Sequence, residues 1–329
     1  MALDHLYFGK RKAGEADIAD MEAADWDLHE QLLRYAGTDD RLSSLMAKGH
    51  GLRAAATYSG PMDFAQDMDE ISIEDFRKAA DLEPNYFTKE GFGALVARFG
   101  ADVPVDLNTP VTRINWGGPM VVVETDKGSI RAKKVIITVS TGVLAFGNIE
   151  FEPELPPHYT ESFFDLPMGM LTKIPVEIKG SRLGLKPFDD LLIERPARHD
   201  IYFLSFPFDK DLMVGFVGGD FAWELSVAGE AAARDFAIDR LVGIFGSDVR
   251  KFVGRSMMTN WGAEPSVRGA YAAARPGRAQ ARDILAVPIN ERIYFAGEAL
   301  AGPLIQTCSG ARLSGEKVAR DIVQLAQGT

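Results

Sequence analysis

The chain has 329 residues, of which 46% are hydrophobic and 25% charged, and its formal net charge is -11. Because single hydrophobic cores stop growing at roughly 250–300 residues, this length predicts two ordered domains that share an interface. A nucleic-acid partner calls for clustered Lys and Arg, so the acidic balance argues against one. An acidic surface mildly favours cationic substrates such as amines, although acidity also serves solubility alone.

The cysteine and histidine residues argue against a disulfide and a metal site. Cys308 is the single cysteine, so a disulfide within the chain is excluded, and the five histidines show no ligand spacing. No metal site is therefore expected. The sequence also has neither a run of about 18 uncharged apolar residues nor a basic, apolar leader, which predicts a cytoplasmic protein that does not enter the membrane.

Residues 11–80 are rich in Ala, Glu, Asp, Leu and Met, and apolar residues such as Leu28 and Leu32 recur at helical spacing. This pattern predicts two to four helices. Another short helix is expected over Glu74–Asp81, because Pro84 disfavours helix in the residues before it.

Beyond this helical region the pattern changes to short strands around one helix, Phe92–Phe99. β-like runs follow at Val103–Leu107 and Val111–Trp116, and Asp126-Lys127-Gly128 marks a tight hairpin. The apolar run Val135–Val139 is typical of a strand buried on both faces of a parallel sheet. Together these features predict an α/β core.

Residues 145–265 combine Pro-rich connections with alternating strands and a helix, which predicts a second, mixed sheet. The elements expected there are Lys173–Ile178, Asp200–Phe206, Leu212–Phe216 and the helix Ala231–Phe245. A strand at Ile293–Ala296 and a long helix at Gly310–Leu325 then return to the first core. That core is therefore predicted to be discontinuous and interrupted by the second one.

Two turns near the C-terminus contain glycines at positions suited to binding a ligand. Phe295-Ala296-Gly297-Glu298 is a strand that stops at a glycine, which permits close ligand approach, and presents a carboxylate that can accept a hydroxyl hydrogen bond. Thr307-Cys308-Ser309-Gly310-Ala311 opens a helix whose free N–H groups suit an anion or a developing negative charge. An ordinary strand-to-loop turn, and a helix N-cap by Thr307 or Ser309, account for the same residues structurally.

With three further stretches in the same order, these turns resemble the flavin-containing amine oxidase superfamily, which includes monoamine, polyamine and L-amino-acid oxidases. The stretches are residues 91–96 with 107–114, residues 135–144 with 149–156, and residues 260–271. The resemblance implies an α/β, or mixed α+β, fold: a partial FAD-binding, Rossmann-like core plus a substrate domain of mixed β-sheet and helices. The implied division is 1–84, the helical part of the substrate domain; 85–144, an FAD-domain segment; 145–265, the substrate-domain sheet and helices; and 266–329, the C-terminal FAD-domain segment.

The resemblance also implies a set of cofactor-binding residues: Val111, Gly297, Glu298, Thr307, Cys308 and Ala311. In this interpretation the backbone of Val111 binds the adenine, Glu298 binds the ribityl or pyrophosphate region, and the N–H of Cys308 points to the flavin C2 oxygen. The FAD is expected to be noncovalent, because Ala270 stands where covalent members carry a flavin-linked cysteine.

Three residues are implied at the reaction centre. Lys173 resembles the lysine that holds a water near flavin N5, although the strand pattern alone equally suits a solvated lysine. Tyr271 falls where monoamine oxidases place one wall of an aromatic cage, but the opposite wall falls at Thr307, so the full cage is absent. Trp261 is expected to pack near the ring, and a buried structural tryptophan is an equal alternative.

The Gly-x-Gly-x-x-Gly turn, by which family members hold the pyrophosphate, is not found. Gly49-His50-Gly51 is the nearest glycine pair, but no third glycine or preceding strand accompanies it, so a loop is expected. Three explanations remain open: a separate subunit supplies the dinucleotide half, the chain is a truncated product, or it is a noncatalytic remnant. A second subunit carrying the motif is favoured, because splitting leaves a sheet edge and an apolar face uncovered.

The implied function is FAD-dependent oxidation of an amine or amino acid to an imine, with O2 as electron acceptor. Two alternatives remain open: a flavin-free scaffold or partner subunit that keeps the fold, and a flavin dehydrogenase or desaturase with another acceptor. The sequence does not decide the substrate. An amino-acid oxidase needs an arginine for the substrate carboxylate, and the candidates are Arg53, Arg195, Arg198 and Arg268.

Overall fold

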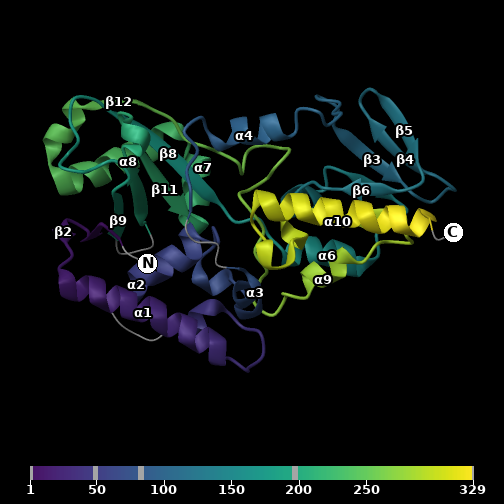
Figure 1. Cartoon of the computed structure of the whole chain (residues 1–329), viewed down its shortest axis with the longest axis horizontal. Coiled ribbons are helices and arrows are strands. Elements are labelled where there is room, and N and C mark those ends of the chain that lie inside the picture. The colour runs from purple at the N-terminus through teal and green to yellow at the C-terminus, as the bar shows by residue number, and fades with distance from the viewer. Residues whose placement is uncertain (1–2, 47–50, 81–84, 195–198, 328–329) are drawn as a thin grey trace.

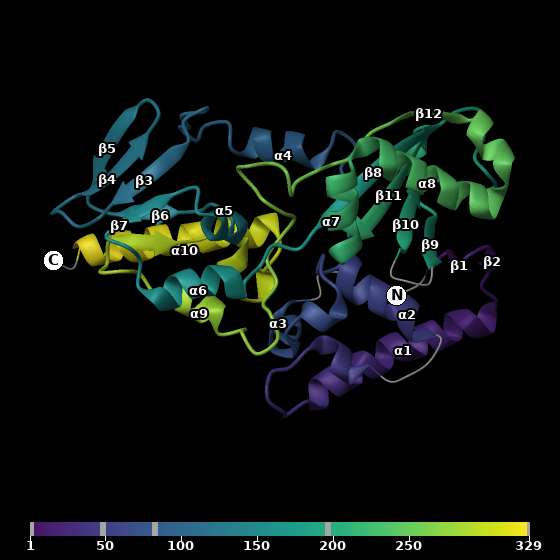
Figure 2. The same cartoon turned by 180° about the vertical axis from the view of Figure 1, so that it is seen from behind.

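The computed structural model describes residues 3–46, 51–80, 85–194 and 199–327. A large sheet with two covering helices forms one lobe, and smaller sheets with a long C-terminal helix form the other (Figures 1 and 2). The N-terminal helices lie along one side of the large-sheet lobe, and α4 runs along the opposite edge of the molecule toward the small sheets. The fold is thus a mixed arrangement of helices and sheets.

The large sheet has seven strands in the order β12-β8-β11-β10-β9-β1-β2. Along β8 every second side chain is buried, because successive residues of a strand face opposite sides of the sheet. The helices α7 (Gly219–Ala228) and α8 (Glu230–Phe245) contribute to its apolar core. The strands are β1 (His5–Phe8), β2 (Arg11–Lys12), β8 (Leu171–Ile178), β9 (Asp190–Glu194), β10 (Ile201–Ser205), β11 (Leu212–Gly218) and β12 (Val253–Ser256).

The strands and the helix predicted between residues 173 and 245 are confirmed with small shifts of their ends. β1 and β2 were not predicted, because each is very short and β2 is entirely exposed and polar. β1 pairs in parallel with β9, from His5 opposite Leu191 to Phe8 opposite Glu194. The first residues of the chain therefore extend the large sheet.

The helical region consists of α1 (Glu15–Arg34), α2 (Gly51–Thr57) and α3 (Ile73–Lys78), joined by the short turns η1 (Leu42–Leu45), η2 (Tyr58–Met62) and η3 (Met68–Glu70). The predicted helices are confirmed here. Asp81 and Pro84, at the predicted end of the last helix, lie outside the described residues, as do Gly49 and His50 of the glycine pair. Gly51 is the first residue of α2.

The second lobe contains a four-stranded sheet in the order β5-β4-β3-β7 and a two-stranded parallel sheet of β6 and β13. The hairpin predicted at Asp126-Lys127-Gly128 joins β4 to β5. Its elements are β3 (Val111–Asn115), β4 (Val121–Thr125), β5 (Gly128–Ala132), β6 (Val135–Ile137), α5 (Thr141–Phe146), β7 (Glu150–Glu152), α6 (Pro157–Asp165), α9 (Ala281–Ala286), β13 (Ile293–Phe295) and α10 (Cys308–Gln327).

One apolar core unites residues far apart in the sequence of this lobe. Tyr159 and Phe163 of α6 pack around Phe295 of β13, with ring centroids 6.2 and 5.7 Å from it. Ile137 and Leu285 belong to the same core. Helix α6 thus packs on the discontinuous core, whereas the sequence division placed residues 145–265 with the other sheet.

Two sequence predictions in this lobe are wrong. Residues 103–107 form no strand, and their apolar side chains at Val103, Val105 and Leu107 are exposed. β6 is not buried on both faces, because Ile136 at its centre is 36% exposed. Helix α4 (Phe92–Phe99) forms where predicted, yet it buries none of its residues. In each case a pattern typical of a buried element lies at the surface of the described chain.

A buried ion pair ties the helical region to the second lobe. The guanidinium of Arg282 in α9 donates to both carboxylate oxygens of Asp75 in α3, at 2.6 and 2.7 Å. The same guanidinium donates to the carbonyls of Ala272 and Ala299, and the N–H of Ala274 donates to Asp75 at 2.7 Å. This network fixes the turn after β13 relative to α3.

Candidate functional site

A cleft of about 300 Å³ lies where the parallel strands β6 and β13 end. Residues 138–141 after β6 and residues 296–300 after β13 line it, together with Ala311 of α10. Ligands of α/β folds bind at the carboxyl ends of parallel strands, where the connecting loops leave a crevice. The structure thus brings three of the predicted cofactor residues together: Gly297, Glu298 and Ala311.

Gly297 and Glu298 form the turn at the edge of this cleft. Gly297 has φ 144° and ψ -175°, a conformation essentially restricted to glycine. The carboxylate of Glu298 accepts hydrogen bonds from the N–H groups of Ala272 at 3.0 Å and Gln306 at 3.1 Å. Burial raises the pKa of Glu298, although Arg282 acts in the opposite direction. The side chain is therefore fixed in position, and protonation would let it donate as well as accept.

The start of α10 lies beside the cleft and is capped as the sequence predicts. The N–H of Gly310 donates to the hydroxyl of Thr307 at 2.9 Å, so Thr307 is the N-cap. The first helical bond runs from Ala311 to the carbonyl of Thr307, which leaves the N–H groups of Cys308 and Ser309 outside the helical pattern. The Cys308 thiol is free and exposed.

Val111 lies in β3, opposite Thr125 of β4, and is not among the residues that line the cleft. The structure therefore groups five of the six predicted cofactor residues at one turn and one helix end, with Val111 in a neighbouring sheet. Sequence reasoning missed Ser140, which caps α5 and lines the same cleft. A serine directly after an apolar strand and before a helix was the available signal.

Replacing Gly310 with alanine is expected to destabilise the protein by about 1–3 kcal/mol, because the added Cβ overpacks the helix start. That Cβ would lie 2.0 Å from the carbonyl oxygen of Leu304 and 2.7 Å from Ala301. Gly315 of the same helix has nothing within 4 Å of its Cβ position, so Gly315→Ala is the matched control. It is expected to stabilise by up to about 1 kcal/mol. Urea unfolding curves measure both; equal effects would contradict the packing role of Gly310.

A network of backbone hydrogen bonds brings the three predicted reaction-centre residues into one region. Lys173 exchanges hydrogen bonds with Thr259: its N–H donates to the Thr259 hydroxyl, and its carbonyl accepts from the Thr259 N–H, both at 2.9 Å. The Trp261 carbonyl accepts from Gly269 at 3.1 Å. The carbonyl of Tyr271 accepts from Gly169 at 2.8 Å, at the approach to β8. Residues 169–173 and 259–271 thus form one connected unit.

The side chains of this unit differ in their surroundings. The Lys173 ammonium lies 5.6 Å from the centroid of the Phe216 ring, and burial lowers the pKa of Lys173. Its surface is nevertheless open to solvent. The Tyr271 hydroxyl donates to the Met62 carbonyl at 3.3 Å, and burial raises the pKa of Tyr271. Trp261 is 48% exposed, so it is not the buried structural tryptophan considered as an alternative.

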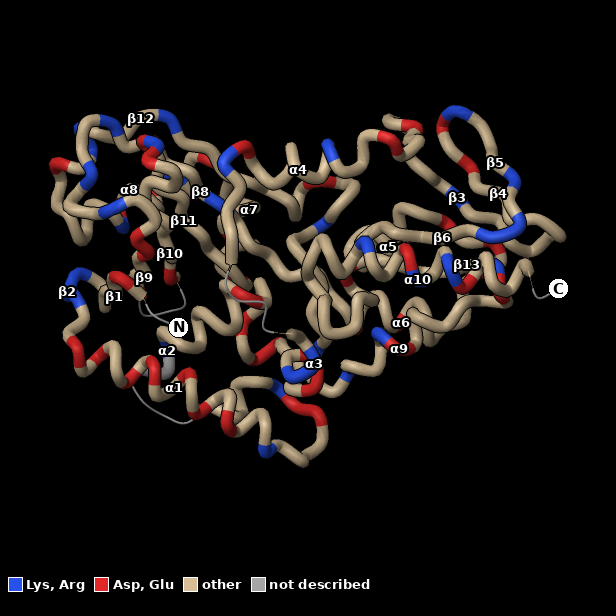
Figure 3. The backbone as a smooth tube through the Cα atoms, viewed as in Figure 1, with Lys and Arg blue, Asp and Glu red and all other residues tan. Residues whose placement is uncertain are grey.

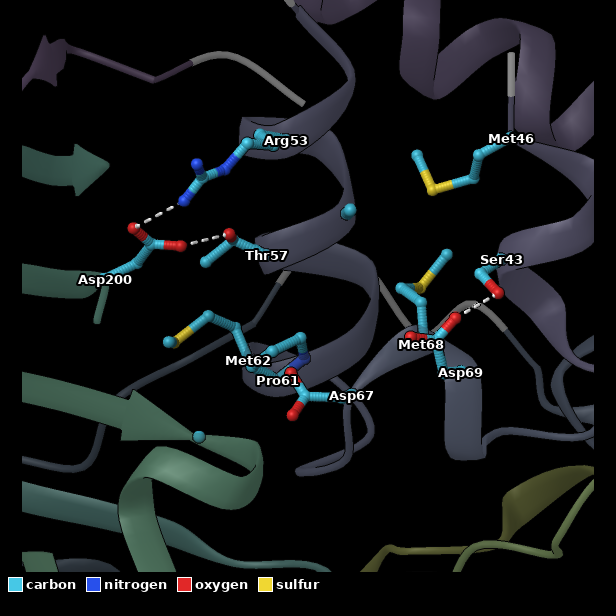
Figure 4. Close-up of a pocket in the computed structure, with 12 residues that line it drawn as sticks. Ser43, Met46, Arg53, Thr57, Pro61, Met62, Asp67, Met68, Asp69 and Asp200 are labelled. Atoms are coloured by element: carbon cyan, nitrogen blue, oxygen red, sulfur yellow. Dashed lines mark hydrogen bonds and ion pairs between the residues drawn. The ribbon is translucent and has the colours of Figure 1, made fainter. Parts of the chain in front are cut away.

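A second cavity, of about 440 Å³, lies next to this unit (Figure 4). Met62, whose carbonyl accepts the Tyr271 hydrogen bond, lines this cavity, whereas Ala270 lines the first cleft. Tyr271 therefore lies between the two. Arg53 lines the second cavity, and the Arg268 guanidinium stacks over the ring of Phe146 at 3.8 Å. Arg195 and Arg198 lie outside the described residues.

Acidic and basic residues are interspersed along most of the chain, and acidic residues recur along α1 (Figure 3). Among the described residues, no group of three or more His, Cys, Asp or Glu side chains could hold a metal ion. Within the same ranges, no helix is both long and apolar enough to cross a membrane.

A parallel strand pair that ends at a glycine turn beside a helix N-terminus defines a protein of the nucleotide-cofactor-binding class. The chain belongs to the family of flavin containing amine oxidoreductases, whose sequence pattern matches residues 13–323. The family is defined by a flavin cofactor. At about 300 Å³ the cleft is at the lower end of the range for ligand pockets, so a group as large as FAD would be only partly enclosed by the described residues. The bare Cα of Gly297 and the capped start of α10 fit such a group.

Similar proteins agree with this assignment. Lysine-specific histone demethylase 1 homolog 1 of Oryza sativa subsp. japonica is 30% identical over 253 residues, which cover 73% of this chain and 29% of that protein. Polyamine oxidase 4 of the same organism is 28% identical over 262 residues, which cover 77% of this chain and 52% of that protein. The chain thus corresponds to between about a third and a half of the length of these relatives.

The solved structure of a double mutant of putrescine oxidase, redesigned in its cofactor binding, has the same fold. The TM-score is 0.76 at 16% sequence identity, and the match covers 97% of this chain and 81% of that chain. This likeness confirms the predicted fold class.

Proposed function

We propose that the chain oxidises an amine or amino acid to an imine with noncovalently bound FAD, and that O2 is the electron acceptor. The observation that carries the proposal is the hydrogen-bonded unit of residues 169–173 and 259–271, which connects the backbones of Lys173, Trp261 and Tyr271, with Tyr271 bonded to Met62 of the larger cavity. When bound, FAD accepts a hydride equivalent from the carbon that carries the amine, and water then hydrolyses the imine.

The roles of this chain's residues follow from their surroundings. Burial lowers the pKa of Lys173, so this lysine releases its proton more readily than an ordinary lysine and can hold a water or exchange a proton beside Phe216. Tyr271 keeps its proton and remains a fixed wall between the two cavities. Trp261 offers an exposed aromatic face to the approaching substrate.

The cofactor roles are divided along the cleft. Gly297 allows close approach, Glu298 binds a hydroxyl of the ribityl chain, and Ala311 and Thr307 shape the helix end. The N–H of Cys308 would bind the flavin C2 oxygen, and the backbone of Val111, in β3 outside the cleft, would contact the adenine. In this scheme residues 85–144 and 266–329 form the FAD-binding part, and residues 1–84 and 145–265 form the substrate domain.

We further propose that a second subunit carrying Gly-x-Gly-x-x-Gly covers the exposed apolar surface formed by α4 and its neighbours. The guanidinium of Arg312 lies 4.4 Å from the centroid of the Phe99 ring, which joins the end of α4 to the start of α10. Large exposed apolar patches on a protein mark interaction sites. The exposed side chains are Phe92, Leu95, Val96, Phe99, Val103, Val105, Leu107, Ile136 and Leu313.

The chain purified alone is expected to lack stoichiometric FAD, and co-expression with a chain carrying the motif is expected to restore flavin absorption and amine-dependent O2 consumption. Leu95→Asp is expected to lower recovery of the complex about tenfold or more, because a charge is placed at an apolar contact. Val227→Asp, at an 89% exposed position of α7, is the matched control.

Four outcomes contradict parts of this proposal. Stoichiometric FAD in the chain alone, or a native polypeptide that carries the motif itself, removes the second subunit but leaves the reaction. Flavin without O2 consumption points to a dehydrogenase or desaturase. A complex that never binds flavin indicates the scaffold alternative.

A further inference from the structure

Gln306, the residue before the N-cap of α10, has a backbone conformation that residues with a side chain rarely adopt. Its φ is 64°, in the left-handed region where the Cβ comes close to the following carbonyl oxygen. Such a conformation persists only where surrounding contacts fix it, and residues of this kind cluster at functional sites. Contacts of Gln306 with its neighbours must therefore offset this strain.

Two hydrogen bonds hold Gln306 in this conformation. Its N–H donates to the carboxylate of Glu298, and its side-chain amide donates to the carbonyl of Ala272, both at 3.1 Å. The N–H of Ala272 donates to the other carboxylate oxygen of Glu298 at 3.0 Å. These three residues thus form a closed set of hydrogen bonds, the Gln306 triangle.

The Gln306 triangle joins the two sides of the candidate site. Ala272 directly follows Tyr271, and Glu298 directly follows Gly297 of the cleft. Burial raises the pKa of Tyr271, and the charge of Glu298 contributes to this rise, so Glu298 also acts on the phenol through space. The bond from the side-chain amide spans 34 positions in the sequence. It connects the segment that carries Tyr271 to the start of α10.

The carbonyl of Ala272 has a second donor. Arg282 donates to the same oxygen at 3.0 Å, and a carbonyl oxygen can accept two hydrogen bonds. Gln306 is partly exposed, whereas the Arg282 side chain is only 10% exposed. Loss of the Gln306 amide therefore leaves the Ala272 carbonyl hydrogen-bonded, so the fold is expected to tolerate it.

A purely structural role does not require glutamine at this position. Glycine and asparagine adopt the left-handed conformation with less strain, and both would retain the N–H that bonds to Glu298. What glutamine adds is an amide on a side chain long enough to reach the Ala272 carbonyl. The strained residue thus makes one additional contact, and that contact is with the segment that carries Tyr271.

We infer that Gln306 is a positioning residue, whose side-chain amide sets the distance between the Tyr271 segment and the turn at Gly297. The inference rests on the proposed function, which assigns Tyr271 to the substrate and Gly297 to the flavin. Gln306 acts through Ala272, so it orients the wall formed by Tyr271 without taking part in the reaction itself. When the amide bond breaks, this distance is less tightly held.

Gln306→Asn tests this role, because asparagine suits the left-handed conformation but its amide is one methylene short of the Ala272 carbonyl. The melting temperature of the full chain is expected to stay level or rise, since the backbone strain decreases. Hydrogen exchange of the Ala272 N–H is expected to accelerate about fivefold, the factor that one hydrogen bond of ordinary strength contributes. Mass spectrometry of peptides that span residues 270–272 measures this exchange.

Two further variants separate the reach of the side chain from its backbone conformation. Gln306→Met keeps the length of the side chain and removes its donor, so it is expected to accelerate the same exchange by a similar factor. Gln324→Asn makes the matched replacement at an exposed position of α10 and is expected to change neither this exchange nor turnover. Exchange within α8 is expected to keep its wild-type rate in all three variants.

Turnover by the flavin-loaded complex, measured per bound flavin, gives a second readout. Both Gln306 variants are expected to lower kcat about 3–10-fold while KM stays within about twofold, because Tyr271 orients the amine more than it adds affinity. A residue that only supported the fold would lower the amount of active complex. It would leave kcat per bound flavin unchanged.

Unchanged exchange at Ala272 in both Gln306 variants would overturn the inference. So would an equal acceleration within α8, since a general loss of stability would then explain the effect. Wild-type kcat per flavin in both variants would overturn it as well. Failure of the proposed function has a different signature: the wild-type complex itself would bind no flavin or oxidise no amine. The exchange comparison in the full chain would then still decide whether Gln306 holds the Tyr271 segment.

Discussion

Replacing Lys173 with methionine is expected to lower O2-dependent turnover by the flavin-loaded complex about 100-fold or more, the usual scale for losing a positioned proton-transfer group. Methionine keeps the length of the side chain and removes its charge. Because burial lowers the pKa of Lys173, the wild-type rate is expected to show a titration below the usual lysine range. That titration disappears in the variant. Rates measured across pH with an oxygen electrode test both statements.

The same substitution separates a chemical role from a structural one. A lowered folded-state pKa means that the folded protein holds this proton less tightly than the unfolded chain. Burying the charged ammonium therefore costs folding free energy. This cost is full at low pH and is relieved as pH rises through the folded-state and then the unfolded-state pKa of Lys173. Lys173→Met removes this penalty, so the melting temperature is expected to stay level or rise. Lys179→Met, just beyond β8 and paired with Glu177, is the control. A turnover within twofold of wild type would refute the role of Lys173.

Asp75→Ala is expected to destabilise the protein by about 3–5 kcal/mol, because it leaves the Arg282 guanidinium buried without its carboxylate. The Asp75 side chain is 1% exposed, and that of Arg282 10%. The control is Asp239→Ala, which breaks the exposed pair with Arg250 and is expected to cost less than about 1 kcal/mol. Urea unfolding curves measure both changes.

A double replacement tests whether the unpaired buried charge causes this loss of stability. Asp75→Leu combined with Arg282→Met removes both charges, so it is expected to be less destabilising than Asp75→Leu alone. A double variant that is as unstable as the sum of the two single variants would show that the charges act independently. In that case the ion pair would not be what joins α3 to the turn after β13.

The sequence predicted the elements that obey a simple periodicity. β8 alternates buried and exposed side chains, and α8 carries its apolar residues at helical spacing, so both were found within a residue or two. β1 and β2 were missed because two to four residues carry too little pattern to compete with the helical composition around them. The spacing of apolar residues predicts a helix or strand only when the element is long enough for that spacing to repeat.

Burial was harder to predict than secondary structure. The run at Val135–Val139 and the helix Phe92–Phe99 have the composition of buried elements, yet Ile136 and all of α4 lie at the surface. Apolar composition indicates a helix or strand that could be buried, and it does not say whether the fold buries it. The strand expected at Val103–Leu107 failed for the same reason, since no neighbouring strand pairs with it in the described structure.

The sequence predicted single residues of the candidate site, and the fold shows which of them lie together. Gly297, Glu298 and Ala311 were singled out from turns, and the cleft unites them. The connection of Lys173 to Thr259 spans 86 positions in the sequence and had no local signal. The larger cavity was missed for a similar reason, because Asp69 and Asp200 come from distant turns and neither is part of a recognisable motif.

The hydrogen-bonded unit of residues 169–173 and 259–271 has a mechanical consequence. Its members bond to one another from Gly169 with Ala270 to Lys173 with Thr259, the latter continuing the pairing of β8 with β12. If the lobes rotate relative to each other when ligands enter, the spacing of Lys173, Trp261 and Tyr271 is preserved, because the bending is taken up outside the unit. The three predicted reaction-centre residues would then move together, and the variable distance would be the one between them and Gly297.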